Sequence, residues 1–120
     1  AKLGGVNGIS VLTPFDYIDF VIAMKVTDII LTDSGGIQEE APSFNIPVLV
    51  LREVTERPEA VSAGTALLVG TDTKKIVRAV IELTTDMTKY QKISGKKNPY
   101  GNGTAAKAIE RILADWMQTN

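Results

Sequence analysis

The chain has 120 residues, of which 44% are apolar, and this length suits one folded domain with a single core. Its formal net charge is −1 with both signs mixed along the sequence, which argues against nucleic acid as a partner, and no apolar stretch approaches the roughly 20 residues that cross a membrane. Cysteine and histidine are both absent, which excludes disulfides, thiolate and histidine metal sites, and any catalytic triad with a histidine base within this chain.

Four short apolar runs have the composition of strands that are buried on both faces, and each ends at a polar or glycine-containing turn. These runs are residues 9–12, 29–31, 48–51 and 66–69. Between the first two, the segment from Asp16 to Lys25 carries apolar residues at helical spacing. This part of the chain is therefore predicted to form a βαβ unit.

The second half of the chain is predicted to contain three helices. The first begins at Pro58, and the second runs from Asp72 to Thr84, where Asp72 or Thr73 can cap its start. After a shorter segment and the sharp turn GKKNPYGNG, residues 104–118 are predicted to form an alanine-rich amphipathic helix. Alternating strands and helices predict an α/β fold, namely a Rossmann-like parallel sheet of about four strands with flanking helices. Such a sheet is small for a complete doubly wound domain, so we expect the chain to be part of a larger protein.

The sequence DSGGIQEE, residues 33–40, follows directly on the second apolar run and predicts a strand end, a tight turn and the start of a helix. Gly35 and Gly36 have no Cβ atoms, so a ligand can approach the backbone, and the N–H groups of the first helical turn attract an anion. This pattern is typical of a phosphate site. The alternative is structural, with Ser34 as a helix cap and the glycines serving the turn alone.

A dense run of charged residues from Arg52 to Glu59 follows the third apolar run. The guanidinium groups of Arg52 and Arg57 suit phosphate or carboxylate ligands. Three glutamates can hold these arginines by ion pairs, and they are Glu53, Glu56 and Glu59. The alternative is a solvated charged surface. Because ligands of parallel sheets bind at the carboxyl ends of the strands, we expect this run and the DSGG turn at the same edge of the sheet.

Other residues near the turn have both a binding and a structural interpretation. Glu40, one turn into the helix, can accept hydrogen bonds from the hydroxyls of a ribose, whereas Glu39 should point elsewhere because helical neighbours face about 100° apart. Both also place favourable charge near a helix N-terminus. Gln38 could equally be a surface residue, and Asp33 is expected to orient the turn. Phe20 fits the core better than a ligand site, although an aromatic ring beside a nucleotide can stack on a base.

Three motifs occur in order along the chain, namely DSGGIQEEAP, TERPE and NPYGNG. With the sequence between them, they resemble the non-hydrolysing UDP-N-acetylglucosamine 2-epimerases from about Val11 to the final helix. The resemblance implies a cytoplasmic enzyme with two Rossmann-like domains in the glycosyltransferase-B arrangement and an active site between them. It also implies interconversion of UDP-GlcNAc and UDP-ManNAc by elimination of UDP and its addition to the other face, with no metal and no nicotinamide cofactor.

The same resemblance assigns UDP-binding roles to six residues. Glu40 would hold the ribose, Phe20 the uracil region and Arg57 the nucleotide side of the cleft. The phosphates would be held by the turn residues Ser34, Gly35 and Gly36. The expected ligands are UDP and UDP-N-acetylhexosamines.

The chain also departs from the family pattern. The acid–base carboxylates and a phosphate-binding arginine of the family belong to its N-terminal domain, and its active-site histidine precedes the region present here. Phe15 stands where many members have a glutamine beside the uracil, and Asn102 stands where an aspartate is common. We therefore interpret residues 1–120 as an incomplete C-terminal UDP-binding domain whose N-terminal catalytic domain is absent. We expect no catalytic residue in it and no activity from the chain alone.

Two other functions stay open on the sequence. The chain could be a nucleotide-binding or assembly module that docks on another polypeptide, which the apolar stripe ending at Trp116 favours, or a glycosyltransferase fragment of the same architecture. TERPE and NPYG favour the epimerase. If faces that are buried in a longer protein are bare here, we expect the chain to form homo-oligomers.

Overall fold

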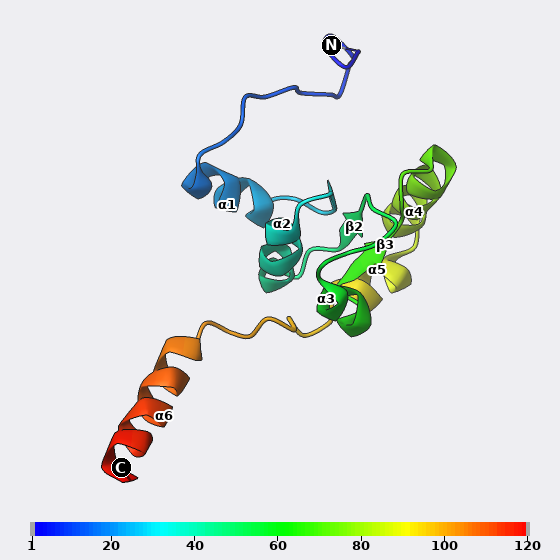
Figure 1. Cartoon of the computed structure of the whole chain (residues 1–120). Coiled ribbons are helices and arrows are strands. Elements are labelled where there is room, and N and C mark those ends of the chain that lie inside the picture. Colours follow the sequence, from blue (N-terminus) through cyan, green and yellow to red (C-terminus); the bar gives the residue numbers. More distant parts are fainter. Residues whose placement is uncertain (1, 120) are drawn as a thin grey trace.

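The structure is a computed structural model that describes residues 2–119, and it has an α/β fold built on one small parallel sheet (Figure 1). The strands lie in the order β1 (Ile30–Thr32), β2 (Val48–Val50) and β3 (Ala66–Leu68). The register places Ile30 beside Val48, and Val48 beside Ala66. The helices are α1 (Tyr17–Lys25), α2 (Gly35–Glu40), the 3-10 helix η1 (Ala41–Phe44), α3 (Pro58–Ala63), α4 (Thr73–Thr85), α5 (Met87–Ser94) and α6 (Ala105–Thr119).

The prediction of a strand at residues 9–12 is wrong. This segment has no regular secondary structure and lies in an arm that leads away from the sheet (Figure 1), with Val11 and Leu12 61% and 63% exposed. A strand forms where a neighbour completes its hydrogen bonds, and no strand in the described part of the chain lies beside this segment. The sheet within residues 2–119 therefore has three strands rather than four, and α1 precedes the sheet instead of connecting two of its strands.

Both faces of the sheet are covered, because alternate residues of β2 point to opposite sides. Val48 packs in one buried cluster with Met24 of α1 and Ala60 of α3. Leu49 points the other way and packs with Leu83 of α4 in a second cluster. β2 is thus the central strand, and its burial on both faces explains its uninterrupted apolar sequence.

Side-chain caps set the starts of the helices. Oδ1 of Asp16 and Oδ1 of Asp72 each accept a hydrogen bond of 2.9 Å from the backbone N–H three residues later, at the starts of α1 and α4. α3 begins at Pro58, as predicted. The segment after α4 was not predicted to be helical, but it forms α5 because Asp86 caps its first turn.

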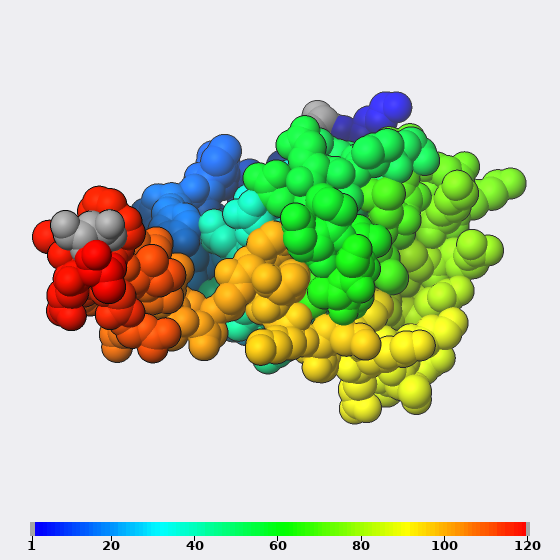
Figure 2. Space-filling model, turned by 60° about the horizontal axis from the view of Figure 1, so that its bottom comes forward, coloured from blue at the N-terminus to red at the C-terminus, as the bar shows by residue number. Residues whose placement is uncertain are grey.

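The predicted C-terminal helix is confirmed as α6, which stands away from the sheet and forms one end of the molecule (Figures 1 and 2). Its large apolar side chains are exposed, and they are Ile109, Ile112, Leu113, Trp116 and Met117. The molecule is consequently elongated, with extents of 64 × 30 × 25 Å. Within residues 2–119, no helix is both long and apolar enough to cross a membrane.

Candidate functional site

The DSGG turn lies at the carboxyl end of β1, where the chain passes into α2. Oγ1 of Thr32 accepts a hydrogen bond of 3.0 Å from the N–H of Ser34, which fixes the turn. Oγ of Ser34 accepts a hydrogen bond of 3.5 Å from the N–H of Ile37, so Ser34 has the capping role that its structural interpretation predicted. Asp33 was expected to orient the turn, but its side chain is exposed and Thr32 has that role instead.

The two glycines leave space beside the turn. Gly36 is exposed, and a Cβ atom added to it would lie 3.8 Å from Oγ of Ser34. A Cβ atom added to Gly35 would lie 3.7 Å from Cζ and Nη2 of Arg57. The first N–H groups of a helix have no partner within the helix. The turn therefore offers backbone donors next to a cationic side chain, which is the combination that an anion requires.

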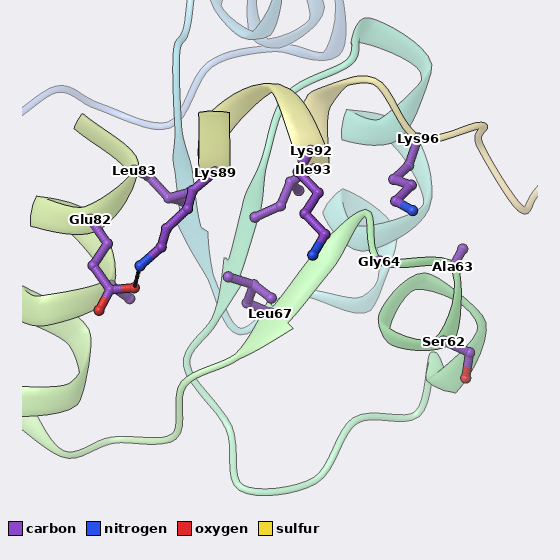
Figure 3. A pocket seen from close by; sticks show the side chains of 11 residues that line it. Ser62, Ala63, Gly64, Leu67, Glu82, Leu83, Lys89, Lys92, Ile93 and Lys96 are labelled. Atoms are coloured by element: carbon purple, nitrogen blue, oxygen red, sulfur yellow. Dashed lines mark hydrogen bonds and ion pairs between the residues drawn. The ribbon is translucent and has the colours of Figure 1, made fainter. Parts of the chain in front are cut away.

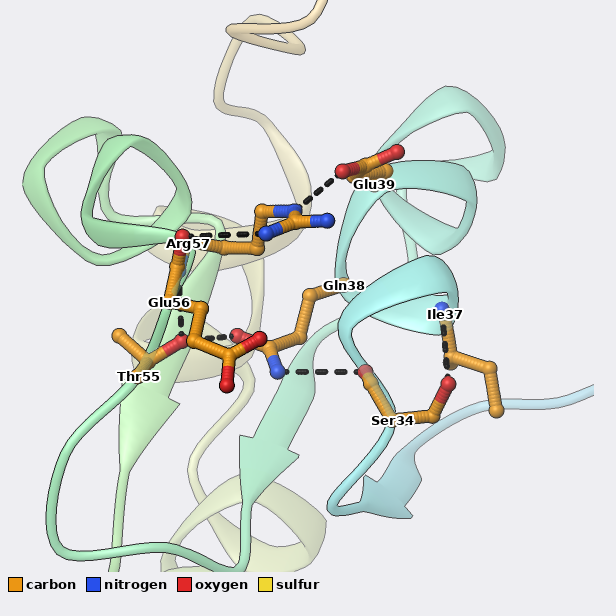
Figure 4. A network of polar contacts seen from close by, with 7 residues as sticks. All are labelled: Ser34, Ile37, Gln38, Glu39, Thr55, Glu56 and Arg57. Atoms are coloured by element: carbon orange, nitrogen blue, oxygen red, sulfur yellow. Dashed lines mark hydrogen bonds and ion pairs between the residues drawn. The ribbon is translucent and has the colours of Figure 1, made fainter.

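Arg57 is held beside the turn by contacts from α2 and from its own loop (Figure 4). Its Nε donates a hydrogen bond to Oε1 of Glu39, and its Nη1 donates to the carbonyl oxygen of Glu56 at 3.2 Å. The hydrogen bond to Glu39 and the negative charge of Glu39 raise the pKa of Arg57 above its ordinary value. Cζ and Nη2 are the atoms nearest to the Cβ position of Gly35.

The ion pairs of the charged run differ from the prediction. Nη1 of Arg52 lies 3.6 Å from Oε1 of Glu56, which agrees with the prediction for this pair. Arg57 pairs with Glu39 of α2 instead of with a glutamate of its own run. Glu53 accepts a hydrogen bond of 3.4 Å from the backbone after β3. The pair between Glu39 and Arg57 was missed because it depends on how two separate loops meet at the edge of the sheet.

Gln38 links the turn to the loop after β2 (Figure 4). Its Nε2 donates to the carbonyl oxygen of Ser34 at 3.2 Å, and its Oε1 accepts from Oγ1 of Thr55 at 2.7 Å. The same Thr55 hydroxyl accepts a hydrogen bond of 3.0 Å from the N–H of Arg57. Gln38 is only 1% exposed, so its interpretation as a surface residue is wrong. Its spacing of one helical turn from Ser34 was a signal for the first contact, whereas nothing in the sequence indicated Thr55.

Glu40 and Phe20 have different environments. Glu40 is the last residue of α2, and its Oε2 is buried without a hydrogen-bond partner among residues 2–119. A buried carboxylate oxygen without a hydrogen-bond donor is unfavourable. Phe20 of α1 is half-buried and packs against the cluster that contains Met24, which is the core position that its helical spacing predicts. The uracil role of Phe20 stays a prediction.

The NPYGNG turn contacts the buried cluster on one face of the sheet through Tyr100. Asn98 orders this turn, because its Nδ2 donates to Oγ of Ser43 at 2.8 Å and its Oδ1 accepts from the N–H of Tyr100 at 2.9 Å. Tyr100 packs against the buried cluster that contains Met24 and Ala60, and this burial raises its pKa.

A separate hollow of about 440 Å³ lies beside β3, between α3, α4 and α5 (Figure 3). Leu67, Leu83 and Ile93 are among its apolar lining residues. Lys89, which also lines it, pairs with Glu82 at 3.1 Å. None of the six predicted UDP-binding residues lines this hollow, so it is distinct from the candidate site.

The arrangement around Arg57 is suited to a phosphate-bearing ligand. It brings together a guanidinium group, which Glu39 of α2 holds in place, and a turn with two glycines. Within residues 2–119, no group of three or more acidic side chains is placed to hold a metal ion.

Comparison with known proteins agrees with the resemblance found in the sequence. A family model described as UDP-N-acetylglucosamine 2-epimerase matches residues 1–114. A protein of that name from Yersinia pestis is 52% identical over 117 residues, which are 98% of this chain and 31% of that protein. This chain therefore spans about a third of the length of the curated relatives that it matches.

Solved structures of the same kind share the fold. The structure of UDP-GlcNAc 2-epimerase from Neisseria meningitidis bound to UDP-GlcNAc has a TM-score of 0.83 and 50% identity, over 87% of this chain and 28% of that one. The S. aureus MnaA–UDP co-structure has a TM-score of 0.88 and 47% identity, over 97% of this chain and 32% of that one. The three-stranded parallel sheet described here is thus part of a larger glycosyltransferase-B-like architecture in these proteins.

Proposed function

This chain belongs to the UDP-N-acetylglucosamine 2-epimerase family, and we propose that it is the part of such an enzyme that binds the UDP moiety during the interconversion of UDP-GlcNAc and UDP-ManNAc. The observation that carries the proposal is the position of the Arg57 guanidinium group beside Gly35 of the DSGG turn. A diphosphate at this turn would meet backbone N–H groups and a fixed positive charge together. Relatives of this chain bind UDP-GlcNAc and UDP in solved structures, which supports the choice of ligand.

The proposed roles rest on the structure of the turn and on the family resemblance. The diphosphate is assigned to Ser34, Gly35 and Gly36 with Arg57. The ribose is assigned to Glu40 on the family resemblance, because a carboxylate can accept hydrogen bonds from ribose hydroxyls. The uracil region is assigned to Phe20 on the family resemblance, and Phe20 is half-buried on α1.

In the proposed reaction this chain holds the leaving group. When UDP departs from the sugar, negative charge develops on the diphosphate, and donors that are already in place stabilise that charge. The same contacts retain UDP until it adds to the other face of the sugar. Proton transfer at the sugar needs acid–base groups, and we assign those groups to the N-terminal domain of the longer enzyme.

We further assign residues 1–120 to the C-terminal UDP-binding domain of the longer enzyme, with residues 104–118 as the last helix. We place the enzyme in the cytoplasm on the family resemblance alone.

The partner of the exposed helix α6 is proposed to be a second copy of the chain. Its apolar side chains are solvent-exposed, and a self-association that covers them is favourable. Its charges also balance, with Lys107 and Arg111 against Glu110 and Asp115, so two copies do not repel each other strongly. This observation favours an assembly role in addition to nucleotide binding. The glycosyltransferase alternative has less support, because the family model and the named relatives are epimerases.

A UDP titration followed by backbone amide chemical shifts tests the binding proposal. UDP should shift the amide signals of residues 34–37 and of Arg57, and leave those of Ala105–Thr119 unchanged. Uridine monophosphate, which has one phosphate fewer, should produce the same pattern at higher concentration. Shifts confined to the hollow lined by Leu67 and Ile93 would contradict the proposed site.

An assay of the isolated chain tests its proposed share of the reaction. Incubation with UDP-GlcNAc should produce no UDP-ManNAc, because the acid–base groups are assigned to another domain. A full-length family member serves as the positive control under the same conditions. Conversion by the isolated chain would contradict the division of roles between the two domains.

A further inference from the structure

We infer that Gln38 and Thr55 are positioning residues that hold Arg57 at the DSGG turn and thereby raise the affinity for UDP without touching it. The inference rests on the proposed function of this site. The observation behind it is a continuous path of hydrogen bonds from the carbonyl oxygen of Ser34, through Gln38 and Thr55, to the N–H of Arg57.

The path joins two segments that the sheet alone does not align. Ser34 and Gln38 are one helical turn apart in the first segment, and Thr55 and Arg57 are two residues apart in the second. The hydrogen bond of 2.7 Å between Oγ1 of Thr55 and Oε1 of Gln38 connects them. Thr55, two residues before Arg57, therefore connects the loop after β2 to α2.

The burial of Gln38 makes the hydrogen bond to Thr55 favour one position of the loop after β2. Gln38 is 1% exposed, so both ends of its amide need partners within the protein. Nε2 donates to Ser34 and Oε1 accepts from Thr55, so a loop position that moves Thr55 away would leave the buried Oε1 without this donor. The two groups therefore favour one position of the loop over its alternatives.

Two consecutive residues of α2 then fix Arg57 at two points. Gln38 acts through Thr55 on the backbone N–H of Arg57, and Glu39 acts directly on Nε of its side chain. Arginine has several rotatable bonds, and ordering them when a ligand binds costs free energy. A side chain that is already held beside Gly35 avoids much of that cost.

A double-mutant cycle on the chain tests the inference by calorimetric titration of UDP. Thr55→Val keeps the shape of the side chain and removes the hydroxyl, whereas Thr55→Ser keeps the hydroxyl. We expect Thr55→Val to weaken UDP binding about threefold to tenfold and Thr55→Ser to bind within about twofold of the wild type, as coupled residues typically show. When Arg57 is already replaced by alanine, Thr55→Val should cause no further loss, because its effect runs through Arg57.

The outcomes separate this inference from the function on which it rests. Wild-type binding that is weakened by Arg57→Ala but unchanged by Thr55→Val would overturn the inference and leave the proposed function standing. An equal loss from Thr55→Val with and without Arg57 would also overturn it, because the effect would not pass through Arg57. A folded wild-type chain that does not bind UDP would overturn both. If Thr55→Val does not fold by circular dichroism, Thr55→Ala removes the same hydroxyl, with the same expected loss and the same dependence on Arg57.

Discussion

The guanidinium group of Arg57 lies beside Gly35, so that a Cβ atom on this glycine would be 3.7 Å from both Cζ and Nη2. The contact joins the start of α2 to the loop after β2, two segments that belong to different strand–helix connections. An anion that binds the N–H groups of the turn would therefore meet the positive charge of Arg57 without rearrangement of the backbone. The predictions for the turn depend on this contact.

Gly35→Ala should separate stability from binding. A distance of 3.7 Å is an ordinary van der Waals contact, and alanine favours helices, so the free energy of unfolding should stay the same or rise by up to about 1 kcal/mol. The added methyl group occupies the space between the turn and Arg57, so we expect the affinity for UDP to fall about tenfold, or about 1.4 kcal/mol. Urea unfolding and calorimetric titration measure the two quantities. Ser62→Ala on α3 is the control, and an unchanged affinity in Gly35→Ala would contradict the assignment of the diphosphate.

Glu40→Gln should reduce the preference of the chain for UDP over 2′-deoxyuridine diphosphate. The amide keeps the shape of the side chain but removes the charge that accepts strong hydrogen bonds, so UDP should bind about tenfold more weakly, since hydrogen bonds to charged groups are worth about 1.5–3 kcal/mol. Stability should not fall, because Oε2 of Glu40 has no partner to lose within residues 2–119. The matched ligand is 2′-deoxyuridine diphosphate, for which the loss should be smaller. Equal losses for the two ligands would place Glu40 away from the ribose.

Gly70→Ala should destabilise the fold by more than Gly64→Ala does. Both glycines have positive φ angles, +68° and +77°, and an L side chain is strained there, at a cost of about 1–2 kcal/mol. A Cβ atom on Gly70 would also collide with the carboxylate of Glu53, whereas one on Gly64 would meet only Lys96 at 3.6 Å. Urea unfolding should therefore show a loss of about 1 kcal/mol for Gly64→Ala and about 2–3 kcal/mol for Gly70→Ala. Similar losses in the two variants would show that Glu53 moves aside freely.

Local signals in the sequence predicted the elements that local contacts determine. Asp16, Asp72 and Pro58 mark helix starts because each acts on the first turn that follows it. The apolar residues 48–50 identify the central strand because both of its faces are covered. Residues 9–12 are also largely apolar, but a strand needs a neighbour as well, and composition does not report whether one is present.

Contacts between separate loops could not be predicted from the sequence. The turn was recognised from Ser34 and its glycines, yet the pair of Glu39 with Arg57 and the link from Gln38 to Thr55 were not predicted. Both depend on the distance between the ends of β1 and β2, which is a property of the assembled sheet. Long-range pairing of this kind leaves no periodic pattern in either segment.

Self-association of the chain should depend on α6. Its apolar side chains are exposed, and Ile112 and Leu113 are 63% and 54% exposed. We expect sedimentation of the wild-type chain to show a mass that increases with concentration, and the double substitution Ile112→Lys and Leu113→Lys to shift the chain toward monomer. Val77→Lys on α4, which replaces another exposed apolar residue, is the control. A wild-type chain that stays monomeric at all concentrations would contradict the proposed homo-oligomer.

Calorimetric titration of UDP into the purified chain tests most directly whether the turn Ser34–Gly36 and Arg57 hold its diphosphate. Uridine is the phosphate-free control, and Arg57→Ala and Ser34→Ala are the variants, with circular dichroism to establish that each one is folded. We expect saturable binding of UDP to the wild type, weaker binding to both variants, and little binding of uridine. A folded wild-type chain that does not bind UDP, or variants that bind it as well as the wild type, would contradict the proposed site.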